Sequence, residues 1–291
     1  MTTSDASLGP PTPSWEQLLA TLTLDPDQLP DPLGAPGPND VLVCGSPRSG
    51  TTLLTAMLFQ PPAAVSVMEP WDALRMPPAE LFASLRSELR SGELRRGHLD
   101  VAALRSEGSV ATCVDAEQLA RVTLDADYTL AVKFPMLWRY LDRLPTTRFV
   151  VCVRDPREVI ASYRRSPGRL AEGLDYEVPF NRSMNESLHA ATDDVALRRV
   201  LLYDYAYERI VPHLDRPEVF VVRYERWLSE KDALLSELGT FLGADLSRPL
   251  AHIRPPRSRA AEPTEEDNEE TRLIREHCRT AEPLGYHLSG Q

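Results

Sequence analysis

The sequence predicts an α/β protein: a P-loop-type parallel β-sheet, flanked by helices on both faces in a three-layer sandwich. Two observations lead to this prediction. From Val41 onward, short apolar runs alternate with longer amphipathic segments, which is the pattern of a doubly wound sheet. The short runs are apolar on both sides of the pleat, as expected for strands that helices cover on each face.

Five runs are expected to form the strands, and seven segments are expected to form helices between and after them. The strands are VLVC from Val41, AVSV from Ala64, TLAVKF from Thr129, RFVVCV from Arg148 and VFVV from Val219. The helices cover residues 51–60, 78–92, 136–144, 156–165, 187–214, 230–243 and 264–281. Pro156 suits a first helical position. Residues 166–186 are polar and marked by proline and glycine, so we expect a mobile surface segment that could act as a lid.

Residues 1–40 are predicted to lie outside the main domain, which covers residues 41–291. The first dozen residues are expected to be disordered, and Ser14 can cap a short helix over SWEQLLATL. The following stretch, DPDQLPDPLGAPGPND, has too many prolines for regular structure and is read as a connector.

Composition limits the possible partners and the cellular location. A net charge of -11 argues against a general nucleic-acid binder, which needs a basic face. No run approaches the roughly 20 apolar residues of a membrane span, and the N-terminus has no secretory pattern, so a cytoplasmic location is expected. The four cysteines are scattered, which favours reduced core thiols over disulfides or a metal site. The oligomeric state stays open.

Residues Val41 to Leu54, VLVCGSPRSGTTLL, have the form of a strand, a glycine-containing turn and the start of a helix. The turn directs backbone N–H groups to one point, so an anion is expected there. The usual phosphate loop, G-x-x-x-x-G-K-[ST], has lysine where this chain has Thr51. Asp155 could be the magnesium-binding acid of a kinase, but it lies between Arg154 and Pro156, which makes a magnesium site there improbable.

A second motif, RFVVCVRDPREVIASY, follows about a hundred residues later. Arg154 leaves a strand at the carboxyl edge of the sheet, where open α/β folds bind ligands. Ser162 lies two turns into the next helix, so this arginine and serine could clasp a second phosphate. The alternative is that Arg154 only pairs with Asp155 or Glu158.

These two motifs together resemble those of sulfotransferases that use 3′-phosphoadenosine-5′-phosphosulfate (PAPS), in particular bacterial members acting on small molecules or carbohydrates. The match consists of PRSGTT from Pro47 to Thr52, R-D-P-R from Arg154, and the serine eight residues after that arginine. VVRYERWL, with Arg226 in place of an aspartate, and the late LGY ending at Tyr286 also fit the family pattern. The resemblance covers roughly residues 41–286.

The resemblance implies transfer of a sulfuryl group from PAPS to a hydroxyl, or less readily an amine, of a small molecule or sugar. The product nucleotide would be 3′-phosphoadenosine-5′-phosphate (PAP), and no metal would be needed. The implied donor-binding residues are Ser46, Pro47, Arg48, Ser49, Gly50, Thr51, Thr52, Arg154, Ser162, Tyr224 (near the adenine) and Arg257. Arg254 and Arg259 flank Arg257 in the same late loop, and all three could instead form a solvated ion-pairing face.

The resemblance and the local sequence also suggest which residues do the chemistry. Arg48 and Lys133 would neutralise charge on the departing phosphate, and Lys133 is one of only two lysines in the chain. Glu69 would be the base, with a pKa raised by Met68 and Trp71, and Asp72 is the reserve. Alternatively, Lys133 extends to solvent and Glu69 only caps or pairs with an arginine.

Two other functions stay open on the sequence alone. One is an ATP-dependent small-molecule kinase with the same loop and helix architecture, and the other is a catalytically idle nucleotide-binding protein. The acceptor cannot be identified, because its pocket would be built from residues 71–104 and 166–187. These include Trp71, Phe82, Tyr176 and Phe180.

Overall fold

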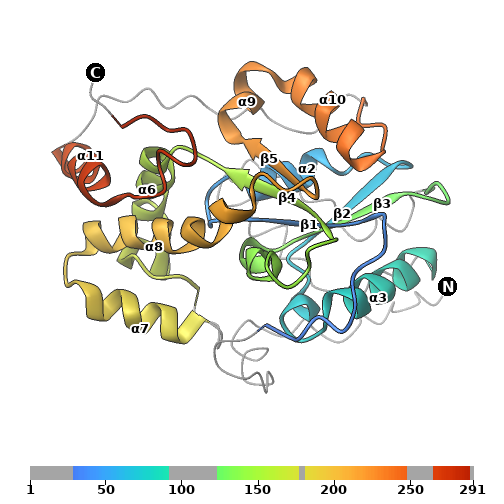
Figure 1. Cartoon of the computed structure of the whole chain (residues 1–291), viewed down its shortest axis with the longest axis horizontal. Helices are drawn as coiled ribbons and strands as arrows, with labels where there is room; N and C mark the ends of the chain where they lie inside the picture. Colours follow the sequence, from blue (N-terminus) through green and yellow to red (C-terminus); the bar gives the residue numbers. More distant parts are fainter. Residues whose placement is uncertain (1–28, 92–122, 177–180, 248–264, 289–291) are drawn as a thin grey trace, which may run out of the picture.

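The structure, a computed structural model, describes residues 29–91, 123–176, 181–247 and 265–288. Its centre is a sheet of five parallel strands in the order β2-β3-β1-β4-β5 (Figure 1). The strands are β1 Asp40–Gly45, β2 Ala64–Met68, β3 Thr129–Lys133, β4 Arg148–Val153 and β5 Val219–Arg223. All five expected strands are therefore confirmed, as is their parallel arrangement.

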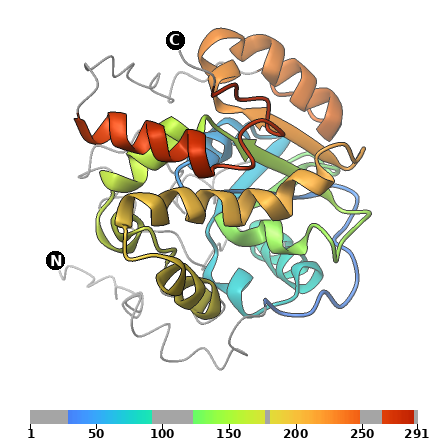
Figure 2. The same ribbon diagram turned by 60° about the vertical axis from the view of Figure 1, so that its left-hand side comes forward.

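Helices cover both faces of the sheet, which confirms the three-layer sandwich. One face packs on α2 (Thr51–Met57), α9 (Tyr224–Ser229) and α10 (Lys231–Leu242). The other packs on α3 (Pro78–Ser91), α6 (Pro156–Arg164) and α8 (Val195–Ile210), with α7 (Arg182–Ala191) and α11 (Glu265–His277) outside them. α11 packs on α6 and α8 (Figure 2). Alternate residues of one strand belong to opposite layers, as shown by Val43 and Cys44.

Two predicted helices differ from the observed ones. The segment 136–144 forms a short 3₁₀ helix, η2 (Pro135–Tyr140), followed by turns. The segment 187–214 is divided into α7, α8 and the 3₁₀ turn η5 (Val211–His213). The break lies at residues 192–194, because the side chain of Asp194 accepts hydrogen bonds from the backbone N–H groups of Ala196 and Leu197 and so starts a new helix.

The described part of residues 166–186 is more closely packed than the surface segment that was expected. It forms the 3₁₀ helix η3 (Gly168–Glu172) and the start of α7. Leu170, Leu174 and Met184 are buried in the core beside α6 and α8. These apolar residues attach the segment to the core, so the expectation of a surface segment is wrong for them.

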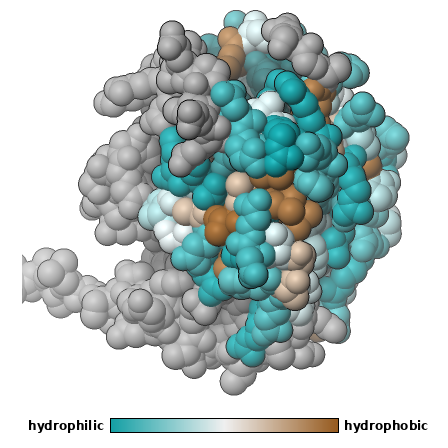
Figure 3. Space-filling model, turned by 90° about the vertical axis from the view of Figure 1, so that its left-hand side faces the viewer, coloured by the Kyte–Doolittle hydropathy of each residue, from teal (hydrophilic) through white to brown (hydrophobic). Residues whose placement is uncertain are grey.

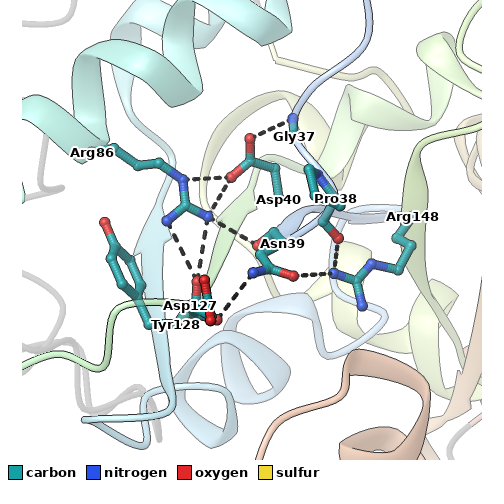
Figure 4. A network of polar contacts seen from close by, with 8 residues as sticks. All are labelled: Gly37, Pro38, Asn39, Asp40, Arg86, Asp127, Tyr128 and Arg148. Atoms are coloured by element: carbon teal, nitrogen blue, oxygen red, sulfur yellow. Dashed lines mark hydrogen bonds and ion pairs between the residues drawn. The ribbon is translucent and has the colours of Figure 1, made fainter.

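A polar network fixes the amino ends of the strands (Figure 4). Asp40, at the start of β1, accepts hydrogen bonds from the Arg86 guanidinium at 2.6 and 2.8 Å and from the backbone N–H of Gly37 at 2.7 Å. Arg86 also donates to the carbonyl oxygens of Asn39 and Tyr128, so it joins α3 to the starts of β1 and β3. Arg148 contributes in the same way at the start of β4 by donating to the carbonyl oxygen of Pro38.

The face of the molecule drawn in Figure 3 is mainly hydrophilic. On the side formed by α7, α8 and α11, at the left of Figure 1, teal hydrophilic side chains surround a smaller brown area (Figure 3). No helix in the described ranges has the length and apolar character needed to cross a membrane. Cys44, Cys152 and Cys278 are buried free thiols, as expected, whereas Cys113 and the predicted helix over residues 14–22 lie outside the described residues.

The Asp40–Arg86 pair is expected to contribute strongly to stability. The side chain of Asp40 is 5% exposed, so Asp40→Asn leaves Arg86 without its counter-charge in a poorly solvated place. We expect the free energy of unfolding in urea to fall by about 3 kcal/mol. Asp31→Asn is the matched control, because Asp31 pairs with Arg143 but its side chain is 82% exposed. Equal losses in the two variants would contradict this role for Asp40.

Candidate active site

Each of the five strands delivers a predicted site residue to the same edge of the sheet. Ser46 follows β1, Glu69 follows β2, Lys133 ends β3, Arg154 follows β4 and Tyr224 follows β5. Because the strands are parallel, their carboxyl ends lie side by side. The chain also crosses from β3 over β1 to β4 at this point, and such a reversal of strand order is where open α/β sheets bind ligands.

The loop of residues 46–50 includes two residues with positive φ angles, a backbone conformation that favours glycine. Gly50 has φ 105°, and Arg48 has φ 66°, which is rare for a residue with a side chain. A Cβ atom on Gly50 would come within 2.4 Å of the Tyr224 ring, so no larger residue fits there. Tyr224 therefore covers the end of the loop, although it lies more than 170 residues later in the sequence.

Several loop side chains face the protein. Ser46 and Ser49 are fully buried, and the Ser46 hydroxyl is hydrogen-bonded to the hydroxyl of Tyr163 in α6. The carbonyl oxygen of Ser49 accepts a contact of 3.4 Å from the Cys152 thiol in β4. These two serines hold the loop in place, so any ligand contact by them would come from the backbone. Arg48 is exposed.

Arg48, Ser162 and Arg154 form a connected clasp. The Arg48 Nε donates to the Ser162 hydroxyl at 3.0 Å, and the carbonyl oxygen of Arg48 accepts from an Arg154 Nη at 3.3 Å. The Arg154 guanidinium also lies 4.1 Å from the centre of the Tyr224 ring and donates to Glu158 at 3.2 Å. The predicted alternative, pairing with Glu158, is thus present, but it occupies only one end of the guanidinium.

Glu225 locks the turn that presents Arg154. Its carboxylate accepts a hydrogen bond from the backbone N–H of Asp155 and another from the Tyr286 hydroxyl, both at 2.9 Å. Asp155 itself caps α6 and binds Arg157 through both carboxylate oxygens. The Y-E and L-G-Y segments therefore meet around the R-D-P-R turn, and the sequence analysis did not identify Glu225 as part of the site.

Lys133 and Glu69 form a buried ion pair on the other side of the loop. The Lys133 side chain is 2% exposed, so the expectation that it could extend to solvent is wrong, and its ammonium group donates to Glu69. The same ammonium lies 3.4 Å from the Thr52 hydroxyl at the start of α2. Among the described residues, Glu69 pairs with this lysine and not with an arginine, and its backbone has φ 47°.

Three buried tyrosines from α6 and α8 support the clasp and the loop. Besides Tyr163, Tyr203 donates to the carbonyl oxygen of Arg154 and Tyr207 to that of Cys152, both at 2.9 Å. Burial raises the pKa of all three hydroxyls well above the usual range, so they remain neutral hydrogen-bond donors. The sequence analysis missed them, although Tyr203 and Tyr207 are spaced for one helix face.

Tyr176 lies close to the charged groups of the site, in the region where the sequence predicted the acceptor. The residue is 41% exposed. Burial and then the negative charge of Glu69 raise the pKa of this hydroxyl, whereas Arg48 lowers it. The Asn181 side chain donates to the Tyr176 carbonyl oxygen at 3.1 Å and fixes the backbone.

Asp175 is a buried carboxyl group next to Tyr176. Its oxygen accepts the Tyr176 backbone N–H at 2.8 Å, and the Asn185 side chain makes two hydrogen bonds to its backbone. Burial raises the pKa of Asp175 to about 6, although the Tyr176 N–H and Arg139 act in the opposite direction. A carboxyl group with this pKa makes stability depend on pH near neutrality.

Some predicted residues take no described part in the site. Arg254, Arg257, Arg259 and Phe180 lie outside the described residues, as does the side chain of Trp71. Asp72, the reserve base, is buried and paired with Arg75. Phe82, which was expected in the acceptor pocket, is instead buried in the hydrophobic core. Within the described ranges, no group of three or more histidine, cysteine, aspartate or glutamate residues is placed to hold a metal ion.

Comparisons with known proteins agree with these motifs. The family model described as "Sulfotransferase family" matches residues 38–248. The nodulation protein NoeE of Sinorhizobium fredii (strain NBRC 101917 / NGR234) is 28% identical over 222 residues, which are 70% of this chain and 50% of NoeE. The chain thus spans about half the length of that relative.

Solved structures of sulfotransferases are similar to this chain over most of its length. One from Alicyclobacillus acidocaldarius is 15% identical, with a TM-score of 0.44, over 88% of this chain and 98% of that one. The sulfotransferase domain of the Synechococcus PCC 7002 olefin synthase is 16% identical, with a TM-score of 0.43, over 89% and 99%. These scores are too low for any residue to be transferred from them.

Removal of the Tyr163 hydroxyl is expected to loosen the loop. Tyr163→Phe deletes the hydrogen bond to Ser46 while keeping the buried ring. If the loop binds the phosphate of PAP, as the sequence predicts, the PAP affinity measured by calorimetry should weaken about tenfold. Tyr140→Phe is the matched control, because that buried hydroxyl donates to the Pro30 carbonyl oxygen and does not contact the loop. Equal PAP affinities in the two variants would show that Tyr163 does not position the loop.

The raised pKa of Asp175 predicts a pH-dependent difference in stability. The folded-state pKa is above the ordinary value of 3.8, so stability is lost as pH rises from about 4 through about 6. Asp175→Asn keeps an acceptor for the Tyr176 N–H without the charge. At pH 8 we expect this variant to exceed the wild type by about 3 kcal/mol in urea unfolding. The difference should vanish below pH 4, and a constant difference at all pH values would refute the assignment.

Proposed function

The chain belongs to the sulfotransferase family, and we propose that it transfers a sulfuryl group from PAPS to a hydroxyl group of a small molecule or sugar. One observation carries the proposal. The Lys133–Glu69 pair and the clasp of Arg48, Arg154 and Ser162 lie on opposite sides of residues 46–50, called here the phosphate-type loop. The pair has the groups needed for proton removal and charge neutralisation. The clasp has the groups needed for a second phosphate.

The clasp side suits the 3′-phosphate that distinguishes PAPS from ATP. Arg154 Nε is buried, and within the described residues it has no hydrogen-bond partner, so a donor is available for a ligand there. Arg48 donates a hydrogen bond to Ser162, which supports a role for Arg48 on the 3′-phosphate side as well as in the loop. The exposed Arg48 and the partly exposed Arg154 supply positive charge where a phosphate dianion needs it. Tyr224 beside Arg154 offers a ring face for the adenine.

Lys133, Thr52 and Glu69 form the reacting side. PAPS supplies the sulfuryl group: the acceptor oxygen bonds to sulfur, and the bond between sulfur and the 5′-phosphate oxygen breaks, leaving its electron pair on PAP. Glu69 accepts the proton of the acceptor hydroxyl. Lys133 neutralises the phosphate oxygen that gains charge, and Thr52 supplies a hydroxyl donor beside it. Tyr176 lies on the acceptor side, near Glu69.

A kinase is disfavoured by what Asp155 does. A kinase of this architecture would use an acidic residue after a strand to hold magnesium. Both carboxylate oxygens of Asp155 are bound by Arg157, and one also caps α6. The lysine of the usual phosphate loop is replaced by Thr51. The buried lysine–glutamate pair argues against an idle nucleotide-binding protein. Such a pair is often less stabilising than packed apolar residues of similar volume, so its presence supports a functional role.

Calorimetry with PAP and with ADP, both without magnesium, tests the donor assignment. PAP should bind at least about 100-fold more tightly than ADP, because only PAP has a 3′-phosphate for the clasp. Equal affinities would mean that no 3′-phosphate site exists. Transfer of label from PAPS to a panel of phenols, alcohols, glycosides and amines then separates an enzyme from an idle binder, which would bind PAP without turnover.

A further inference from the structure

We propose that Lys133 exchanges partners during the reaction cycle. Before the donor binds, its ammonium group neutralises Glu69. Donor binding draws the ammonium toward the 5′-phosphosulfate and leaves Glu69 free to act as the base. This inference rests on the proposed function and adds to it a regulation of the same site.

The backbone holds the two residues at a fixed separation. Met68 and Lys133 are paired in register between β2 and β3, and the Glu69 N–H donates to the Lys133 carbonyl oxygen at 2.6 Å. β2 is an edge strand of the described sheet and β3 is an inner strand, and every residue of both strands is buried. The pair can therefore separate only by rotation of side chains, and the four-carbon stem of lysine allows this.

A second polar group lies within reach of the ammonium group. Thr52 lies at the start of α2, directly after the phosphate-type loop, and its hydroxyl is 3.4 Å from the Lys133 ammonium. The ammonium thus lies between Glu69 on one side and the loop on the other. A small rotation toward Thr52 would move it to the side where an anion bound by the loop would lie.

Burial makes the exchange possible only when the donor is present. The Lys133 side chain is 2% exposed and Glu69 is 20% exposed. A buried ammonium that loses its counter-charge destabilises the protein strongly, so Lys133 stays with Glu69 while no other anion is near. The phosphosulfate supplies a replacement anion. Glu69, which retains access to solvent, can then exist without the lysine.

The exchange orders the reaction. A carboxylate that accepts hydrogen bonds from an ammonium group is less able to take a proton from an acceptor. Glu69 therefore becomes an effective base only after the donor is in place. The acceptor can reach the site earlier, but it is deprotonated productively only in the complex that also contains PAPS.

A double-mutant cycle with PAP as the probe tests the exchange. Calorimetry is carried out on the wild type, Glu69→Gln, Lys133→Met and the double variant. Glu69→Gln should bind PAP about tenfold more tightly, because Lys133 no longer has to leave a carboxylate. Lys133→Met should bind PAP at least about tenfold more weakly. In the Lys133→Met background, Glu69→Gln should change the affinity less than about twofold.

The alternatives give different results. If Glu69→Gln tightens binding equally in both backgrounds, Glu69 acts by direct repulsion and the exchange is wrong. If it tightens binding in neither, the pair does not compete with the donor, and the exchange is again wrong. If the wild type itself fails to bind PAP, the proposed function fails.

Thermal unfolding provides a second measurement, which can be used even if Glu69→Gln is less stable than the wild type. Without PAP, Glu69→Gln should unfold at a lower temperature than the wild type, because its buried lysine is unpaired. With saturating PAP, its unfolding temperature should rise by more than that of the wild type, since tighter binding to the folded state gives a larger shift. An equal rise in the two proteins would contradict the exchange.

Discussion

The parallel register of the five strands is the constraint on which the site depends. Val43, Met68 and Lys133 lie at one level of the sheet, which places Lys133 between the phosphate-type loop and Glu69. A slip of one residue in β3 would direct Lys133 to the opposite face. The network of Asp40, Arg86 and Arg148 holds the amino ends of β1, β3 and β4. It therefore fixes this register from the strand ends opposite the site.

Neutral tyrosine hydroxyls support the backbone around the site, whereas arginines supply its positive charge. Tyrosine hydroxyls from α6 and α8 hold Ser46 and the carbonyl oxygens of Cys152 and Arg154. They cannot ionise at neutral pH, so they add no charge near the ligand. Arginines at the clasp supply the positive charge in a protein whose net charge is -11. An anion would therefore be attracted to this edge of the sheet only over a short range.

The sequence was sufficient for the sheet, because each strand is a continuous apolar run and each is followed by a chemically distinctive residue. The sequence was insufficient where a single capping side chain ends one helix and begins another. Asp194 starts a new helix by capping, whereas residues 187–214 have a helical pattern throughout. The sequence predicted which residues belong to the site but not which of them contact each other. Glu69 was expected to pair with an arginine if it had no catalytic role, and only the pairing of β2 with β3 brings it to Lys133. The hydroxyls of Tyr163, Tyr203 and Tyr207 were missed because a buried tyrosine in a helix looks like an ordinary core residue.

The choice of lysine at position 133 has a physical reason in this setting. Arginine supplies nearly all the positive charge of the chain, and lysine occurs only at positions 133 and 231. An arginine beside Glu69 would bind the carboxylate through two parallel hydrogen bonds. Its planar group would also need more room than is present around the Lys133 side chain, which is 2% exposed. A lysine has a compact charge on a flexible stem, so its ammonium group can turn from one acceptor to another. A site in which one cation must serve first a carboxylate and then a phosphate oxygen requires that property.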